Sequence, residues 1–498
     1  MFAIPDINNW PSGGMTGRRA ICTDCREVSP ENVEEVMGKA RAIHLMNWAE
    51  INYLYDYYRG KQDVRNKVKV TRPEINNKVT VNRANEIVTF KTAYFLSEPI
   101  QYVSAGGEDR VSANVARLNS YMMAENKESK DEKIVDWMHI CGVGVRIVLP
   151  DSESETEGSP VCIYSEDPRL AYCIYWSGLG NKRLAGVLIQ RDEDGQFKEC
   201  VWTPEWYFEL KDGKTVKQEA RTVPYVPVIE YLNNNARMGA FESVIPLLNA
   251  INDVTSNRAD AIQDFVNAYD VFQNCEVDES TYSELTSGGK AINIKSPPGQ
   301  EAKVYRISSA LDQGNTQTVI DDMYDAVLTI CGMPNRNGGS STSDTGAATI
   351  FRDGWESASS RAKDTELMYN DAEREFLKIV LYICGNTGDL RLELADIKIE
   401  HTRNNLSNMQ SRVQILCECL NNDKIHPKIA WTLAGIPNAE EWYRISEQYY
   451  EEQQEALNEQ LEMENEALRK SGQDDSDSEE TGDTAIQESA AGGADSWV

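Results

Sequence analysis

The sequence lacks the features that mark membrane proteins and nucleotide-driven motors. No hydrophobic run approaches the roughly 18–20 residues that cross a bilayer, and the first residues contain neither the basic nor the apolar segment of a secretory signal. The nearest approach to a phosphate-binding loop is Gly213-Lys214-Thr215, where Phe208 occupies the place of the required first glycine. We therefore expect no membrane partner and no nucleotide site.

Histidine is scarce, with four residues in a chain of 498. His44 and His139 fall in helical patterns, His401 ends a predicted strand, and His426 precedes Pro427 at a predicted helix start, so each has a structural explanation. No Gly-x-Ser-x-Gly elbow occurs, nor any carboxylate cluster typical of a metal-dependent nuclease. The sequence predicts no catalytic residue and no cofactor, and we expect a protein that is not an enzyme.

The eleven cysteines form no disulfide framework or metal-ligand pattern. Their irregular spacing in a long chain indicates reduced thiols in a cytoplasmic setting. Cys22 and Cys25 could give two thiolates to zinc, but a structural zinc site usually needs four ligands. The other close pair, Cys417 and Cys419, lies hundreds of residues away. We interpret Cys22 and Cys25 as unconnected thiols and expect no metal.

Basic residues are outnumbered, with 50 Lys and Arg against 80 Asp and Glu, for a formal charge of -30. A protein that gripped nucleic acid over its whole surface would show the opposite balance, because affinity comes largely from neutralising phosphates. Half of the excess, a net -15, lies in residues 440–498. Residues 471–498 contain eight acids and no base, which predicts a disordered acidic tail.

Basic residues cluster once, in a stretch where Asp63 is the single opposing acid. A solvated connecting loop is the simplest interpretation. A charged contact with another subunit, or with DNA phosphates, is the alternative. The cluster consists of Arg59, Lys61, Arg65, Lys67, Lys69 and Arg72.

Apolar periodicity predicts an α+β fold. After a flexible N-terminal arm, residues 1–30, helical spacing covers about 31–58 and 85–96. Between about 143 and 231 the period changes to two, with turn signals such as Asp194-Gly195 and Asp212-Gly213, which predicts an antiparallel sheet.

From residue 241 onward the pattern is helical again, with one compact interruption. The expected elements are a helix of some thirty residues from 241, strands at 291–295 and 303–307, a helix at 316–331, a helix of about forty residues at 345–383, a strand at 390–401 and a helical block at 407–468. A helix of about forty residues usually serves as a strut or an assembly element.

A polar segment, residues 333–344, separates two of these helices and has the composition of a flexible loop. On the helix before it, apolar residues between Val319 and Ile330 share one face, and Asp321 and Asp325 fall on the opposite face. Together with Asp322 these carboxylates could hold a cation, but a solvated acidic face is the favoured interpretation.

Four stretches in a fixed order carry a family resemblance. They are Tyr57-Tyr58-Arg59-Gly60 with residues 82–92 and 94–102; residues 226–231 and 233–235 running into 241–252; the acid-bearing helix, polar loop and long helix of residues 312–384; and residues 390–406. Together they resemble the bacteriophage portal proteins of the SPP1 type. Ala93 stands where the family often has glycine, and Ser97-Glu98 replaces a common glycine-containing turn.

The resemblance implies a portal fold, in which a ring of typically twelve copies occupies one vertex of the capsid. Its parts would be a mixed α/β wing at 31–240, stem helices at 241–275 and 312–333, a small α/β clip at 276–311, a tunnel loop at 334–346, a long helix with a wing return strand at 347–405, and a helical crown at 406–470.

The resemblance also implies a function and its partners. Double-stranded DNA would pass through the channel without sequence specificity during packaging and ejection. A terminase motor, the major capsid and scaffolding proteins and a head-tail adaptor would bind the ring. The protein would be assembled in the host bacterial cytoplasm and reside in the virion at the portal vertex.

Three groups of site residues follow from this resemblance. The DNA-facing tunnel loop would contain Asn335, Arg336, Asn337, Gly338, Gly339, Ser340, Ser341, Thr342 and Ser343. Asp321 and Asp325 would line the channel if their face points inward, because carboxylates repel phosphate and keep DNA centred. Lys290, Lys295 and Lys303 would contact partners at the clip.

Two other classes stay open from the sequence alone. One is a different head-completion or adaptor protein, although adaptors are generally much shorter than this chain. The other is an enzyme with an unrecognised site, against which the empty inventory of catalytic motifs argues.

Overall fold

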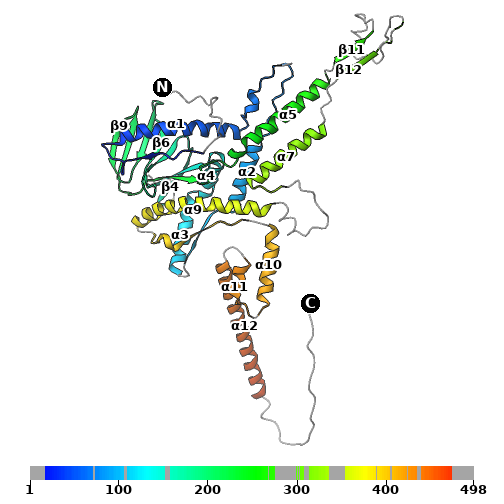
Figure 1. Cartoon of the computed structure of the whole chain (residues 1–498). Helices are drawn as coiled ribbons and strands as arrows, with labels where there is room; N and C mark the ends of the chain where they lie inside the picture. The colour runs from blue at the N-terminus through cyan, green and yellow to red at the C-terminus, as the bar shows by residue number, and fades with distance from the viewer. Residues whose placement is uncertain are drawn as a thin grey trace. The chain divides into compact units, whose positions relative to one another are not determined.

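The chain divides into two compact units, residues 1–404 and 405–498 (Figure 1). The computed structural model describes residues 17–70, 73–105, 109–151, 158–266, 269–274, 299, 301, 303–307, 313–335, 354–387, 390–403, 406–422, 424–434 and 439–473.

The first unit contains the predicted antiparallel sheet region, split into two sheets. The larger has the strand order β1-β5-β6-β7-β8-β9, in which only β1 pairs in parallel. Its strands are β1 Cys22–Thr23, β5 Ala171–Trp176, β6 Arg183–Arg191, β7 Phe197–Trp202, β8 Trp206–Lys211 and β9 Lys214–Ala220. The smaller has the order β10-β3-β4, with β10 Val228–Leu232, β3 Val143–Pro150 and β4 Val161–Glu166.

Both predicted hairpin turns are confirmed, at Asp194-Gly195 between β6 and β7 and at Asp212-Gly213 between β8 and β9. Asp212 has a φ of 49° and Gly213 a φ of 79°. Two successive positive φ values match the twist of the flanking strands, and this is why Asp-Gly is favoured in such turns. The Gly213-Lys214-Thr215 tripeptide is therefore part of a hairpin.

Four helices surround these sheets: α1 Val33–Tyr58, α2 Arg83–Phe95, α3 Asp109–Ala124 and α4 Lys127–Cys141. The two predicted from periodicity, α1 and α2, are confirmed within two residues at each end. Gly60, with a φ of +85°, follows the end of α1. α1 packs on the larger sheet through Val36 and Met37, which join Val187 and Phe208 in one buried cluster.

The stem region differs from its expected outline. Helix α5 covers Ile245–Val266 and ends before residue 275, because strand β11, Tyr269–Gln273, follows it and pairs with β12, Lys303–Ile307. The helix expected to be the second stem helix is α7, which covers Gln313–Cys331. β12 confirms the expected strand at 303–307, whereas the strand expected at 291–295 lies outside the described residues.

The long helix, α9, covers Trp355–Asn386. The part expected at 345–353 lies outside the described residues. After α9 the chain returns as β13, Ile397–Glu400, which pairs with β2, Gln101–Ser104, and so confirms a return strand shorter than the expected 390–401. The second unit contains α10 Leu406–Leu420, α11 Pro427–Leu433 and α12 Ala439–Gln473.

A buried ionic network fixes α9 to α4 and β3. Arg146 donates to Asp131 and, at 3.1 Å, to Glu373, and the Lys127 ammonium lies 2.6 Å from Asp131 and 2.8 Å from Glu373. Two cations thus face two carboxylates, and both Arg146 and Glu373 are fully buried. Burial alone would raise the pKa of Glu373, but Lys127 and Arg146 lower it to about 2.

We predict that Glu373→Gln lowers the free energy of unfolding by about 3–5 kcal/mol, because removing one partner leaves buried cations uncompensated. The matched control is Glu375→Gln, two residues along α9, where the carboxylate is partly exposed and pairs with Lys378. This variant should change the free energy of unfolding by less than about 1 kcal/mol. Denaturant unfolding of the two variants measures the difference. Equal stability of both variants would show that the network does not hold α9.

Candidate functional site

Helix α5 packs against α7 through an apolar face. Leu248 and Ile251 of α5 and Val327 and Leu328 of α7 are buried in one cluster, which Phe241 also joins. The packed side of α7 carries Val327 and Leu328, with Met323 partly buried against them, so the expected face is buried only in part. Val319 and Ile330, which were also expected on it, stay about half exposed.

A polar stripe beside this apolar face of α5 binds a segment that we call the strap, residues 61–70 and 73–81. The strap backbone donates from Val81 to Asn252 at 2.8 Å, from Val79 to Ser256 at 3.0 Å and from Asn77 to Asp260 at 2.7 Å. Asn252, Ser256 and Asp260 are buried beneath it. Because buried polar groups require partners, these residues, which recur at helical spacing, fix the strap to α5.

The basic cluster lies partly in this strap. Lys67 donates to Asn257 at 2.7 Å, and the Lys69 ammonium lies 3.2 Å from Asp260. These two lysines are thus bound to α5, and the interpretation as a solvated connecting loop is wrong for them. Arg65 is exposed, and Arg72 lies outside the described residues. Contact with DNA or with another subunit stays a prediction.

The acidic residues of α7 are exposed. Asp321 accepts a hydrogen bond from Gln317 at 2.7 Å, and Asp325 accepts one from Asn335 at 3.0 Å. Asp322 lies beside them and is also exposed. None of the three forms an ion pair with a described residue, and α7 contains no Lys or Arg. Its outer side is therefore a concentrated negative surface.

The described residues on either side of residues 336–353 come together beside this surface. The described chain stops at Asn335 and resumes at Gly354, where an added Cβ would lie 3.9 Å from the Pro334 Cα. We call this junction of Pro334 and Gly354, which adjoins Asp325, the loop base. Of the predicted tunnel-loop residues, only Asn335 is placed. The others, Arg336, Asn337, Gly338, Gly339, Ser340, Ser341, Thr342 and Ser343, lie outside the described residues.

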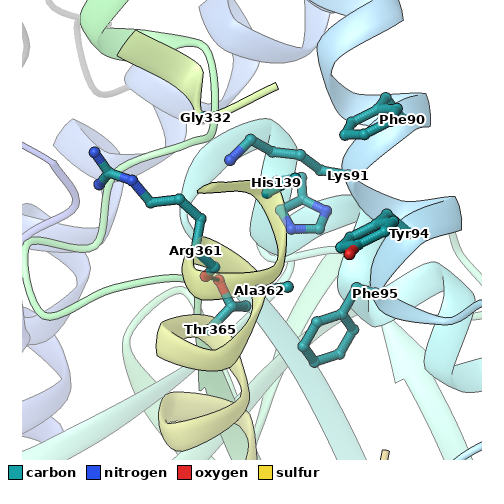
Figure 2. Close-up of a pocket in the computed structure, with 10 residues that line it drawn as sticks. Phe90, Lys91, Tyr94, Phe95, His139, Gly332, Arg361, Ala362 and Thr365 are labelled. Carbon is teal, nitrogen blue, oxygen red and sulfur yellow. Dashed lines mark hydrogen bonds between the residues drawn. The ribbon is translucent and has the colours of Figure 1, made fainter. Parts of the chain in front are cut away.

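The loop base rests on a joint between α2, α7 and α9 (Figure 2). The rings of Phe90 and Tyr94 stack 5.8 Å apart, and Trp355 at the start of α9 lies 6.1 Å from each. Behind them a cavity of about 20 Å³, lined by Lys91 and His139 among others, has room for about one water molecule. The cavity is too small to hold a substrate.

His139 is the buried ionisable group of this joint. Its Nδ1 lies 3.0 Å from Thr92 Oγ1. Burial, with a further contribution from the Lys91 charge, lowers the pKa of His139 to about 3. The imidazole is therefore neutral in the folded protein at any pH where the protein is expected to function.

The structure describes only one of the three lysines predicted to contact partners at the clip. Lys303, in β12, is exposed and lies 3.5 Å from Glu301, whereas Lys290 and Lys295 lie outside the described residues. Within the described ranges, no group of three or more His, Cys, Asp or Glu is arranged to hold a metal ion, and Cys22 and Cys25 are free thiols.

We predict that His139 makes the fold sensitive to mild acid. Because its pKa is lowered in the folded state, its contribution to stability is complete above the unfolded value of about 6.5 and is lost as pH falls toward 3. Between pH 7 and pH 5 this costs about 2 kcal/mol. Denaturant unfolding at both pH values should show a smaller difference for His139→Gln than for the wild type. His426→Gln, at an exposed histidine, is the control, and equal pH dependence in all three proteins would contradict the assignment.

Comparison with known proteins identifies the family. The description "Phage portal protein, SPP1 Gp6-like" matches residues 38–467. Among solved structures, "Neck of empty GTA particle computed with C6 symmetry" is similar over 71% of this chain and 90% of that chain, with 9% sequence identity and a TM-score of 0.44. No curated protein matches the sequence. Every helix in the described ranges is too short or too polar to span a membrane. The chain belongs to the SPP1 Gp6-like family of phage portal proteins.

Proposed function

We propose that this protein forms a ring of twelve copies at one vertex of the phage capsid, and that double-stranded DNA passes through the ring during packaging and ejection. Family membership supports the portal role. The observation that carries the channel is the hydrogen bond that Asn335, the first residue of the predicted tunnel loop in the described chain, donates to Asp325 on the acidic surface of α7. In this proposal the loop continues from that point beside a negative wall.

The acidic surface suits a channel wall. DNA must slide in both directions, so a wall that bound phosphate would stall it, whereas Asp321 and Asp325 repel phosphate and keep the duplex centred. Asp321 and Asp325 are exposed and form no ion pair with a described residue, so their negative charge is available to act on DNA. In this proposal they face the axis.

The loop suits contact with a moving duplex. Residues 337–343 contain only Gly, Ser, Thr and Asn, which offer neutral hydrogen-bonding groups and no strong phosphate contact. Arg336 supplies one cation for a transient phosphate contact. Such a loop touches DNA without reading its sequence, because sequence is read from base edges in the grooves and not from the backbone.

The strands at the far end of α5 and α7 suit partner binding. β11 and β12 form a separate two-stranded ribbon joined to these helices, and Lys303 on β12 is exposed. We assign terminase docking to this ribbon and to Lys290 and Lys295. The sequence contains no complete phosphate-binding loop, so the energy for translocation is supplied by that motor. Capsid and scaffolding proteins and the head-tail adaptor are the other proposed partners.

Native light scattering of the purified full chain tests the ring. Twelve copies of a 56.0 kDa chain give about 670 kDa, and we expect a particle of that mass. A monomeric or dimeric mass at all protein concentrations would contradict the proposal.

Deletion of Asn337–Ser341 tests the loop. We expect the particle mass to stay unchanged, since the loop base is held by α7 and α9, while DNA packaging into procapsids or DNA retention falls. Deletion of residues 152–156, an equally long polar segment between β3 and β4, is the matched control and should leave packaging intact. Normal packaging by the loop-deleted protein would remove the loop from the mechanism.

A further inference from the structure

The stem is a layer of three elements with two free edges of opposite charge. α5 lies in the middle, bound on one side to the strap and on the other to α7 (Figure 1). The strap edge carries the exposed cation Arg65 and exposes Val68 and Val70, and the α7 edge is acidic and exposes Val319 and Ile330. Neither edge is covered by a described part of the chain.

Side chains of the strap edge point alternately toward α5 and away from it, and this exposes its valines. Lys67 and Lys69 turn toward α5, where they contact Asn257 and Asp260. In an extended segment successive side chains point to opposite sides, so the intervening Val68 and the following Val70 turn away and are 84% and 93% exposed. The exposed Arg65 stands three residues before Val68.

The α7 edge also places exposed apolar side chains beside a charged one, but the charge is negative. Val319 and Ile330 are 11 residues apart, which is three helical turns, so both lie on one face. They are 49% and 48% exposed. Asp322 lies one turn from Val319 and borders this face. Both the apolar stripe and the acid beside it are thus available to a neighbour.

The two edges lie at the same level along α5. On one side Lys67 contacts Asn257, and on the other Arg258, the next residue, donates to Gln317 of α7 at 2.6 Å. Val68 and Val319 thus each lie within two residues of a contact with the same turn of α5. Copies placed side by side in the same orientation would bring these valines together.

We propose that the α7 edge of one copy docks against the strap edge of the next copy, with Val319 on Val68 and Val70 and Asp322 facing Arg65. This inference rests on the proposed ring and assigns its stem contact. Two strap edges would repel each other, as would two α7 edges, so the pairing is between unlike surfaces. Unlike surfaces associate head to tail, and this is the arrangement that closes into rings.

A charge-swap series tests the docking. In the full chain, Arg65→Asp and Asp322→Arg should each shift the particle toward smaller species in native light scattering, because each places like charges opposite one another. The double variant should restore the wild-type mass. Asp364→Arg, at an exposed acid on α9, is the control and should have no effect. Intact particles in all variants, or failure of the double variant to recover, would overturn the assignment.

Disulfide trapping tests the same contact without removing charge. Val68→Cys combined with Val319→Cys should give a ladder of covalent multimers under mild oxidation, and each single variant should not. Val216→Cys, at an exposed valine of β9, replaces Val68→Cys in the control pair. Rings that form but give no ladder would refute this contact while leaving the proposed function intact, whereas a chain that never forms particles would refute both.

Discussion

The stem depends on α5, because its two sides must satisfy neighbours of different chemistry. One side buries Asn252, Ser256 and Asp260, which are costly to bury without partners, and the strap supplies those partners. The other side is apolar and packs on α7. Since both neighbours are held, their outer edges are also fixed, and with them the positions of the basic surface, the acidic surface and the loop base.

Local patterns predicted the parts of the fold that depend on local chemistry. The period of two in residues 143–231 and the two Asp-Gly turns indicated the antiparallel sheets, and the apolar spacing indicated α1 and α2 within two residues. These elements follow from side chains near one another in sequence. The sequence also placed Asp321 and Asp325 on a face of α7 opposite Val319. Both carboxylates are exposed as expected, but Val319 is about half exposed as well, so it does not lie on the buried side.

Features set by distant partners could not be predicted in this way. The end of α5 at Val266 was missed because Tyr269 continues the helical spacing, while its strand pairing depends on residues 303–307. The strap looked like a solvated loop because Asp260, which binds Lys69, is 191 residues away. Glu373 occupied an ordinary helical position in the sequence, and only the fold brings it to Arg146. The residues of the site that control its geometry are thus those whose partners lie far along the chain.

The central claim is that copies of this chain close into an annulus around duplex DNA. End-on electron microscopy of the purified, negatively stained particles tests it most directly. The account predicts a rotationally symmetric ring with a central hole wide enough for a DNA duplex. Particles without a hole, or open filaments in place of closed rings, would contradict it.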